Sequence, residues 1–70
     1  TRRDLQQRVR RALARMPERA GKMLILRESG FSYREVAEIV GVAPGSIGTL
    51  LARAQEAFIR AYEDEGKEPQ

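Results

Sequence analysis

A tight turn between two short helices is the feature of this sequence that most limits the folds open to it. Residues 32–35, SYRE, fit a capping box, in which the serine hydroxyl accepts one backbone N–H and the glutamate carboxylate accepts another. Gly41 then ends the helix cheaply, and Pro44 suits the first position of the next one, where its missing N–H is not needed. Two helices joined by such a turn predict a helix-turn-helix.

The apolar residues around the turn have the sizes that this motif needs. Ala37 is small enough to let the two helices approach, and Val42 fills the corner between them. With Ile47 as reference on a helical wheel, Leu51 falls within about 60° of it and faces the core. The same wheel places three more residues on that core face: Ala54, Phe58 and Tyr62.

The rest of the chain is also predicted to be helical, because strand-forming residues are few and no alternation of period two is sustained. We expect helices from a cap at Asp4 to Met16, from Glu18 to Glu28, from Tyr33 to about Val40 and from Pro44 to about Tyr62. The residues expected to face the core in the first three are Leu5, Val9, Leu13 and Met16, then Met23, Leu24, Ile25 and Leu26, then Val36, Ile39 and Val40.

These elements predict an all-α, four-helix domain containing a helix-turn-helix, of the winged-helix-like DNA-binding class but without a wing. We place the domain at residues 1–62 and expect residues 63–70, EDEGKEPQ, to form a polar acidic tail that frays. Because the chain starts at Thr1 rather than Met, we expect it to be a segment of a longer protein.

The absence of two residue types argues against enzyme chemistry. The chain has no cysteine and no histidine, which removes disulfides, thiolate metal sites and the commonest general base. We therefore expect no enzyme activity, no catalytic residue, no metal, no cofactor and no small-molecule substrate. No apolar run approaches the roughly 20 residues of a membrane span, so we expect a cytoplasmic protein without a membrane partner.

Charge is distributed unevenly along the chain. Residues 1–34 hold ten basic and three acidic residues, a net charge of +7, whereas residues 35–70 hold three basic and seven acidic ones, a net charge of −4. A basic half beside an acidic half suggests a polyanionic partner on one side, although a solvated charged surface would look the same.

Candidate DNA-binding residues follow from the two helix starts, where free N–H groups and the helix dipole favour a phosphate. The candidate contacts to the DNA backbone are Ser32, Tyr33, Arg34, Gly45, Arg27 and Lys22. The candidate contacts to bases are Ser46, Thr49 and Arg53. Each has a structural alternative: Ser32 can act as a cap alone, Tyr33 can pack in the core, and Arg53 can pair with Glu56.

Motifs along most of the chain resemble region four of bacterial sigma factors, in particular the extracytoplasmic-function group. The resemblance covers roughly residues 16–58. The matching pieces are Pro17-Glu18-Arg19, Leu26-Arg27, Gly30-Phe31-Ser32-Tyr33, Glu35-Val36-Ala37-Glu38-Ile39, Gly41-Val42, Pro44-Gly45-Ser46-Ile47 and Leu51-Ala52-Arg53-Ala54.

This resemblance implies a role in transcription initiation. It implies that the fourth helix binds promoter DNA near −35 in the major groove, and that the domain docks on the β flap of RNA polymerase. It also implies that an anti-sigma factor masks the domain in some members. The chain departs from the family pattern at four positions, where members usually or often carry basic or other polar residues: Gly48, Leu50, Ala52 and Gln55.

The departures leave alternative functions open. Gly48, Ala52 and Ile59 form a strip of small or apolar residues on the wheel, which we interpret as a candidate face for a protein partner. One alternative is thus a protein-interaction module that binds polymerase or a regulator and has weakened DNA binding. Another is the helix-turn-helix output domain of a response regulator.

Overall fold

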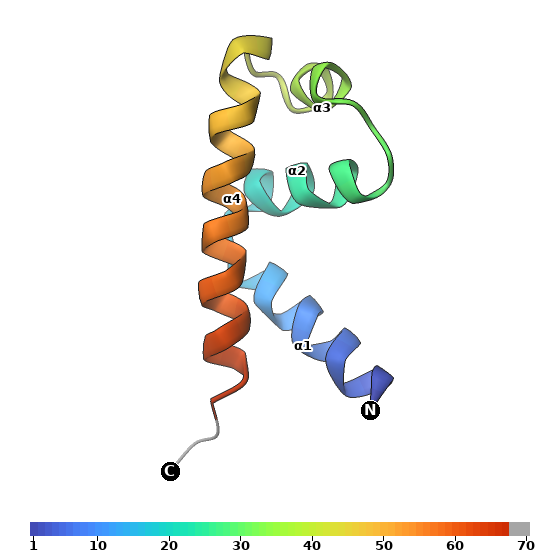
Figure 1. The fold of residues 1–70 in the computed structure, drawn as a ribbon, viewed down its shortest axis with the longest axis vertical. Coiled ribbons are helices and arrows are strands. Elements are labelled where there is room, and N and C mark those ends of the chain that lie inside the picture. Colours follow the sequence, from blue (N-terminus) through green and yellow to red (C-terminus); the bar gives the residue numbers. More distant parts are fainter. Residues whose placement is uncertain (68–70) are drawn as a thin grey trace.

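The computed structural model describes residues 1–67 of the chain. This part contains four helices and no strand. Their bounds are α1 Arg2–Ala14, α2 Glu18–Glu28, α3 Tyr33–Val40 and α4 Pro44–Glu65. Figure 1 shows α4 as a long rod with the other three helices ranged along it. The predicted all-α, four-helix class without a wing is confirmed for these residues.

The helix-turn-helix is built as its local signals predict. The Ser32 N–H donates to the Glu35 carboxylate at 2.8 Å, and the Glu35 N–H donates to the Ser32 hydroxyl at 3.1 Å. Gly41 ends α3 with φ +77°, a left-handed conformation that glycine adopts at little cost. Pro44 is the first residue of α4, and the α3 and α4 axes meet at 92°. This angle lies in the range of helix-turn-helix motifs.

The start of α1 differs in detail from the sequence prediction, whereas α2 begins at Glu18 as predicted. Thr1, not Asp4, is the N-cap of α1, and Asp4 is the acidic partner of its capping box. The helix begins at Arg2, because the Thr1 hydroxyl accepts the Asp4 N–H and the Asp4 carboxylate accepts the terminal ammonium of Thr1. Pro17 is the N-cap of α2, and it makes no side-chain cap.

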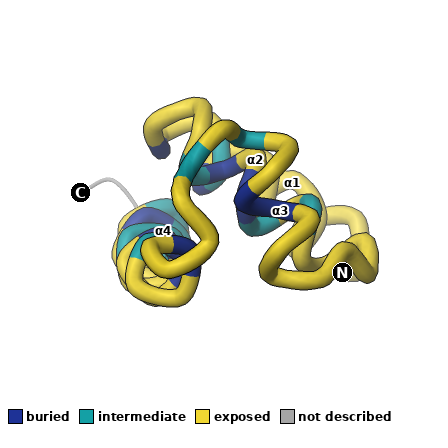
Figure 2. The backbone as a smooth tube through the Cα atoms, turned by 90° about the horizontal axis from the view of Figure 1, so that it is seen from above, coloured by how far each residue is buried: buried dark blue, intermediate teal, exposed yellow. Residues whose placement is uncertain are grey.

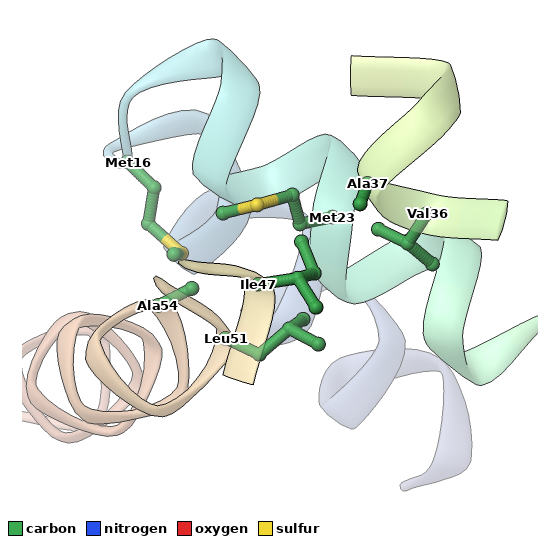
Figure 3. Packing of buried hydrophobic residues seen from close by; sticks show 7 residues of the cluster. All are labelled: Met16, Met23, Val36, Ala37, Ile47, Leu51 and Ala54. Atoms are coloured by element: carbon green, nitrogen blue, oxygen red, sulfur yellow. The ribbon is translucent and has the colours of Figure 1, made fainter. Parts of the chain in front are cut away.

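The main core lies where α2, α3 and the first half of α4 meet. Its members are Met16, Met23, Val36, Ala37, Ile47, Leu51 and Ala54. Figure 3 shows Met23, Val36 and Ile47 converging from three helices. The predicted core positions Ile47, Leu51 and Ala54 are confirmed, with Phe58 half-buried beside them. The predicted core position Tyr62 lies outside this cluster and is half-buried. Figure 2 shows that exposed positions cover the turn and the outer helix surfaces.

Several residues expected in the core are exposed. The exposed fractions are 54% for Leu5, 36% for Val9, 52% for Ile25 and 44% for Ile39. In α1 the cause is its position, because this helix packs chiefly on α4 and little on α2. Only its last turns are therefore covered, and Ala12 rather than Leu5 or Val9 is fully buried.

The C-terminal end of α4 is tied to α1 by polar contacts. Arg8 Nε donates to the Tyr62 carbonyl at 2.9 Å, and its guanidinium lies 3.9 Å from the centre of the Tyr62 ring. Arg11 pairs with Glu65 at 2.9 Å, and Arg15 reaches Glu65 at 3.2 Å and Asp64 at 3.3 Å.

These contacts correct the predicted end of the last helix. It runs to Glu65 instead of Tyr62, because α1 supplies cations for acids that were expected to fray. The last part of the predicted tail, residues 68–70, lies outside the described residues.

No individual helix within residues 1–67 has both the length and the apolar character needed to cross a membrane. The sharply bent pair of α3 and α4 meets that requirement jointly, by length and composition alone.

Candidate nucleic-acid interface

The first half of α4 has a buried side and an exposed polar side. Ile47 and Leu51 are each 2% exposed and anchor the helix in the core. Ser46, Thr49 and Arg53 are all exposed, and their spacing of three and four residues places them on one face. The three predicted base contacts therefore share a surface that a ligand can reach.

Arg53 does not form the ion pair expected as its structural alternative. Glu56 instead approaches Arg60, at 4.0 Å. Within residues 1–67, Arg53 has no acidic side chain within ion-pair distance, so its guanidinium is available to a ligand.

The first turn of α3 brings three of the predicted backbone contacts together. The Ser32 hydroxyl accepts the Glu35 N–H, so Ser32 acts as a cap, while Tyr33 and Arg34 follow it on the exposed surface. Tyr33 is 50% exposed, which shows that it is not a core residue. The Ser32 backbone N–H, and secondarily its hydroxyl, lower the pKa of Glu35. The charged carboxylate therefore remains the acceptor that completes the capping box of α3.

Arg27 lies against this same turn. Its Nη1 donates to the Phe31 carbonyl at 2.7 Å, and its guanidinium lies 4.8 Å from the centre of the Tyr33 ring. A Cβ added to Gly48 would lie 3.9 Å from Tyr33 Cε2 of the same ring. Residues from α2, α3 and α4 therefore form one contiguous group, which their separation in the sequence concealed.

The remaining predicted contacts are exposed but stand apart from this group. Gly45, in the first turn of α4, has no atom within 4 Å of an added Cβ, so its surface is open. Lys22 is exposed on α2 and makes no hydrogen bond or ion pair within residues 1–67 that would connect it to Tyr33 or Arg27.

A second surface, an apolar groove of about 700 Å³, lies between α1, α2 and α4. Its apolar lining consists of Val9, Leu13, Leu24, Ile25, Phe58 and Ile59. Ile25 and Ile59 are its most exposed members, at 52% and 55%. This groove was not predicted from the sequence, because most of these residues were expected to lie in the core.

A signal for the groove was present in residues 23–26, MLIL. Four successive helical positions point in directions spread over roughly 300° at about 100° per residue, so one core face cannot bury all of them. Met23 is 4% exposed and Ile25 is 52% exposed, which is the division that this geometry requires.

The three residues of the predicted partner strip lie in different surroundings. Gly48 faces the Tyr33 ring of the same chain, and Ile59 lines the groove. Ala52 is exposed on α4 between them. The groove thus extends the Ile59 end of the strip, whereas Gly48 belongs to the α3 side.

The sequence of this chain matches a known protein family. The family model described as Sigma-70, region 4 matches residues 6–58, about three quarters of the chain. Neither a curated protein nor a solved structure matches. The matched residues include α3, the turn, α4 as far as Phe58, and all of the apolar groove lining except Ile59. The chain therefore belongs to the sigma-70 region 4 family, the helix-turn-helix DNA-binding domain through which sigma factors take part in promoter recognition by RNA polymerase.

Proposed function

We propose that this domain binds the −35 promoter element by laying the first half of α4 in the major groove. The observation that carries the proposal is the exposed face of Ser46, Thr49 and Arg53 on a helix anchored at 92° to α3. An α-helix fits the major groove, and there each base pair presents a distinct set of donors and acceptors.

Each residue of this face has a chemical role in the proposal. The Arg53 guanidinium can donate two hydrogen bonds to guanine O6 and N7. The hydroxyls of Ser46 and Thr49 can donate to or accept from base edges, and Gly45 lets the DNA backbone approach the helix start closely.

Phosphate contacts come from the neighbouring α3 side. Tyr33, Arg34 and Arg27 are exposed there, and Ser32 orders the turn that presents them. Such contacts set the register of the protein on the duplex, while the base contacts supply specificity. We place Lys22 at the margin of this surface, because nothing holds its side chain toward the turn.

A DNA titration tests this function. The 70-residue chain is titrated against a labelled −35-type duplex and against a scrambled duplex of the same composition, each at 50 and 200 mM salt. We expect tighter binding to the −35 duplex and a fall of affinity with salt, because phosphate contacts release counterions. Equal, weak binding to both duplexes would overturn the proposal.

We further propose that the apolar groove docks RNA polymerase, through a helix of the β flap. Exposed isoleucines beside a concave apolar surface are suited to receive the apolar face of a helix. We infer that an anti-sigma factor would act at the same place, and that the domain works in the cytoplasm beside the polymerase.

The docking proposal is tested with Ile25→Glu and Ile59→Glu. Both side chains are more than half exposed, so neither change should unfold the domain. We expect each to weaken binding of a β-flap peptide at least tenfold without changing binding of the −35 duplex. Unchanged peptide binding in both variants would contradict docking at the groove.

The second candidate function is a protein-interaction module that has weakened DNA binding. It is favoured by the exposed Ala52 and Ile59, which leave an uncharged strip along α4. Ala52→Arg separates the candidates, because it should block a protein partner on this strip while adding a cation near the DNA. The family match lends no support to the response-regulator alternative.

A further inference from the structure

Helix α1 is attached to the rest of the domain mainly by polar contacts. Ala12 is its one buried residue, whereas the exposed fractions of Leu5 and Val9 are 54% and 36%. The connection to α2 consists of residues 15–17, and Met16 within it is buried in the main core. Apolar burial therefore fixes the C-terminal end of α1, and its N-terminal half needs another restraint.

Three arginines of α1 and its C-cap supply that restraint. Arg8, Arg11 and Arg15 recur at spacings of three and four residues, so they lie on one face of the helix. Arg11 donates to the Glu65 carboxylate at 2.9 Å and Arg15 at 3.2 Å. The Glu65 side chain is only 19% exposed, so two cations enclose one carboxylate at the end of α4.

Arg8 binds the end of α4 in a different way. Its Nε donates to the Tyr62 carbonyl at 2.9 Å, and its guanidinium lies 3.9 Å from the centre of the Tyr62 ring. This carbonyl belongs to the last turn of α4, where carbonyl groups lack helical partners and the helix dipole favours a cation. Arg8 thus caps α4 from a neighbouring helix.

Gly66 provides the space for this cap. A Cβ added to Gly66 would collide with the Arg8 guanidinium. The φ of Gly66 is −82°, so alanine could adopt the same backbone conformation without strain. An alanine at this position would therefore displace the guanidinium while leaving every charge of the chain in place.

The helix that these arginines hold also forms one wall of the apolar groove. Val9 and Leu13 line the groove from α1, opposite residues of α2 and α4. None of the three arginines lines the groove, but Val9 follows Arg8 directly in the chain. If α1 swung about residues 15–17, the Val9 wall would move relative to the walls of α2 and α4.

We propose that Arg8, Arg11 and Arg15 are positioning residues for the apolar groove. By binding the C-terminal end of α4, they hold the α1 wall where a docked helix can contact it together with α2. The inference rests on the proposed docking at this groove, and it makes the acidic end of α4 part of the docking device although it lines no groove. Because the wall is in place before the partner arrives, less ordering is needed on binding.

The first measurement is the position of α1 in the 70-residue chain. The chain has no cysteine, so Gln6→Cys on α1 and Glu38→Cys on α3 can carry a pair of spin labels. Electron paramagnetic resonance then gives the distribution of distances between the two helices. We expect a narrow distribution in the parent chain, and a broader one in 1 M salt because the ion pairs are screened.

Two variants release α1 in different ways. Arg8→Gln/Arg11→Gln/Arg15→Gln removes all three cations, and we expect it to broaden the distribution most and to abolish its dependence on salt. Gly66→Ala should broaden it less, since it displaces Arg8 alone. This variant keeps every charge and adds a residue of higher helix propensity, so a broader distribution cannot come from a weakened α4.

Arg3→Gln is the matched control. Arg3 is exposed on α1 and makes no hydrogen bond or ion pair within residues 1–67, so the same loss of charge should leave the distribution unchanged. An unchanged distribution in the variant that lacks all three cations would overturn the proposal.

The second measurement is binding of the β-flap peptide to the unlabelled variants. We expect the variant without the three cations to bind about tenfold more weakly and Gly66→Ala about threefold more weakly, because the position of α1 that suits the peptide is populated less. Arg3→Gln should bind as the parent chain does. Circular dichroism at the temperature of the titration verifies that each variant is folded.

Double variants decide whether Arg8 acts through the α1 wall. Arg8→Gln should weaken peptide binding less in a Val9→Ala background than in the parent chain, because part of the wall that it positions is gone. In an Ile25→Ala background, on the α2 wall, its effect should be unchanged. Equal effects in both backgrounds would overturn the proposal. Failure of the docking function gives a different result, since the parent chain would then not bind the peptide at all.

Discussion

The two ends of α4 are held in place by opposite kinds of interaction. At its N-terminal end, Ile47 and Leu51 are buried against α2 and α3, and the outward side chains make no ion pair until Glu56. At its C-terminal end, Asp64 and Glu65 are bound by Arg11 of α1 and by Arg15, the C-cap of that helix. One end is anchored by apolar burial and leaves its polar face free, while the other uses its charges within the molecule.

This difference changes the meaning of the uneven charge along the chain. Arg11 and Arg15 belong to the basic half that suggested a polyanionic partner, yet both face carboxylates of the acidic half. Their charge is therefore partly neutralised inside the domain. Near the turn, Arg27, Arg34 and Arg53 are exposed and make no ion pair within residues 1–67, so their charge remains available to DNA.

The largest effect should come from breaking the apolar anchor. Leu51→Ala should lower the free energy of unfolding by about 2–5 kcal/mol, because a 2% exposed side chain leaves a cavity between three helices. Ile59→Ala on the same helix, where the side chain is 55% exposed, should cost less than about 1 kcal/mol. Urea unfolding followed by circular dichroism measures both, and equal losses would remove the distinction between the two ends.

A smaller effect is expected from a substitution on the exposed polar face of α4, and it concerns DNA binding rather than stability. Arg53→Gln should weaken binding to the −35 duplex by about 1–3 kcal/mol, because one bidentate or phosphate contact is lost. The unfolding free energy should stay within about 0.5 kcal/mol of the parent, since Arg53 is exposed. Fluorescence anisotropy on matched duplexes measures the binding, and an unchanged affinity would show that this face does not meet DNA.

The ion pairs at the C-terminal end of α4 should stabilise the domain less than the apolar anchor does, and their contribution should be sensitive to salt. Arg15→Gln removes ion pairs to both Asp64 and Glu65, yet the Arg15 side chain is 46% exposed, so the expected loss of stability is at most about 1 kcal/mol. Adding 1 M salt should reduce this loss, and −35 binding should not change. A double-variant cycle with Glu65→Gln checks the pairing, because independent effects would show that the two side chains do not interact.

The smallest effect concerns the cap of α3. The pKa of Glu35 is lowered in the folded domain, so an unfolded chain binds more protons at a pH just below the ordinary value of 4.5. The capping contribution is therefore present above that value and is lost as the pH falls through the lower folded pKa. Glu35→Gln should remove this part of the acid dependence in thermal unfolding, and Glu38→Gln, exposed on the same helix, should not.

One part of the candidate site was predictable from the sequence, and another part was not. The exposure of Ser46, Thr49 and Arg53 was predictable, because a wheel centred on Ile47 places them away from the core. The grouping of Arg27 with Tyr33 and Gly48 was not, since it depends on how α2 meets the turn. Leu5, Val9 and Ile25 were wrongly predicted to lie in the core, because their burial depends on which neighbouring helix covers them.

Local interactions along the chain are enough to predict the helix-turn-helix. Its signals each act over three or four residues, so they can be identified from the sequence alone. They are the capping box of Ser32 and Glu35, the left-handed Gly41 and Pro44 at the start of α4. The position of α1 and the groove beside it arise from contacts between residues about 50 positions apart, such as Arg11 with Glu65. Periodicity shows which residues are apolar, but only the packing of helices decides which of them a neighbour covers.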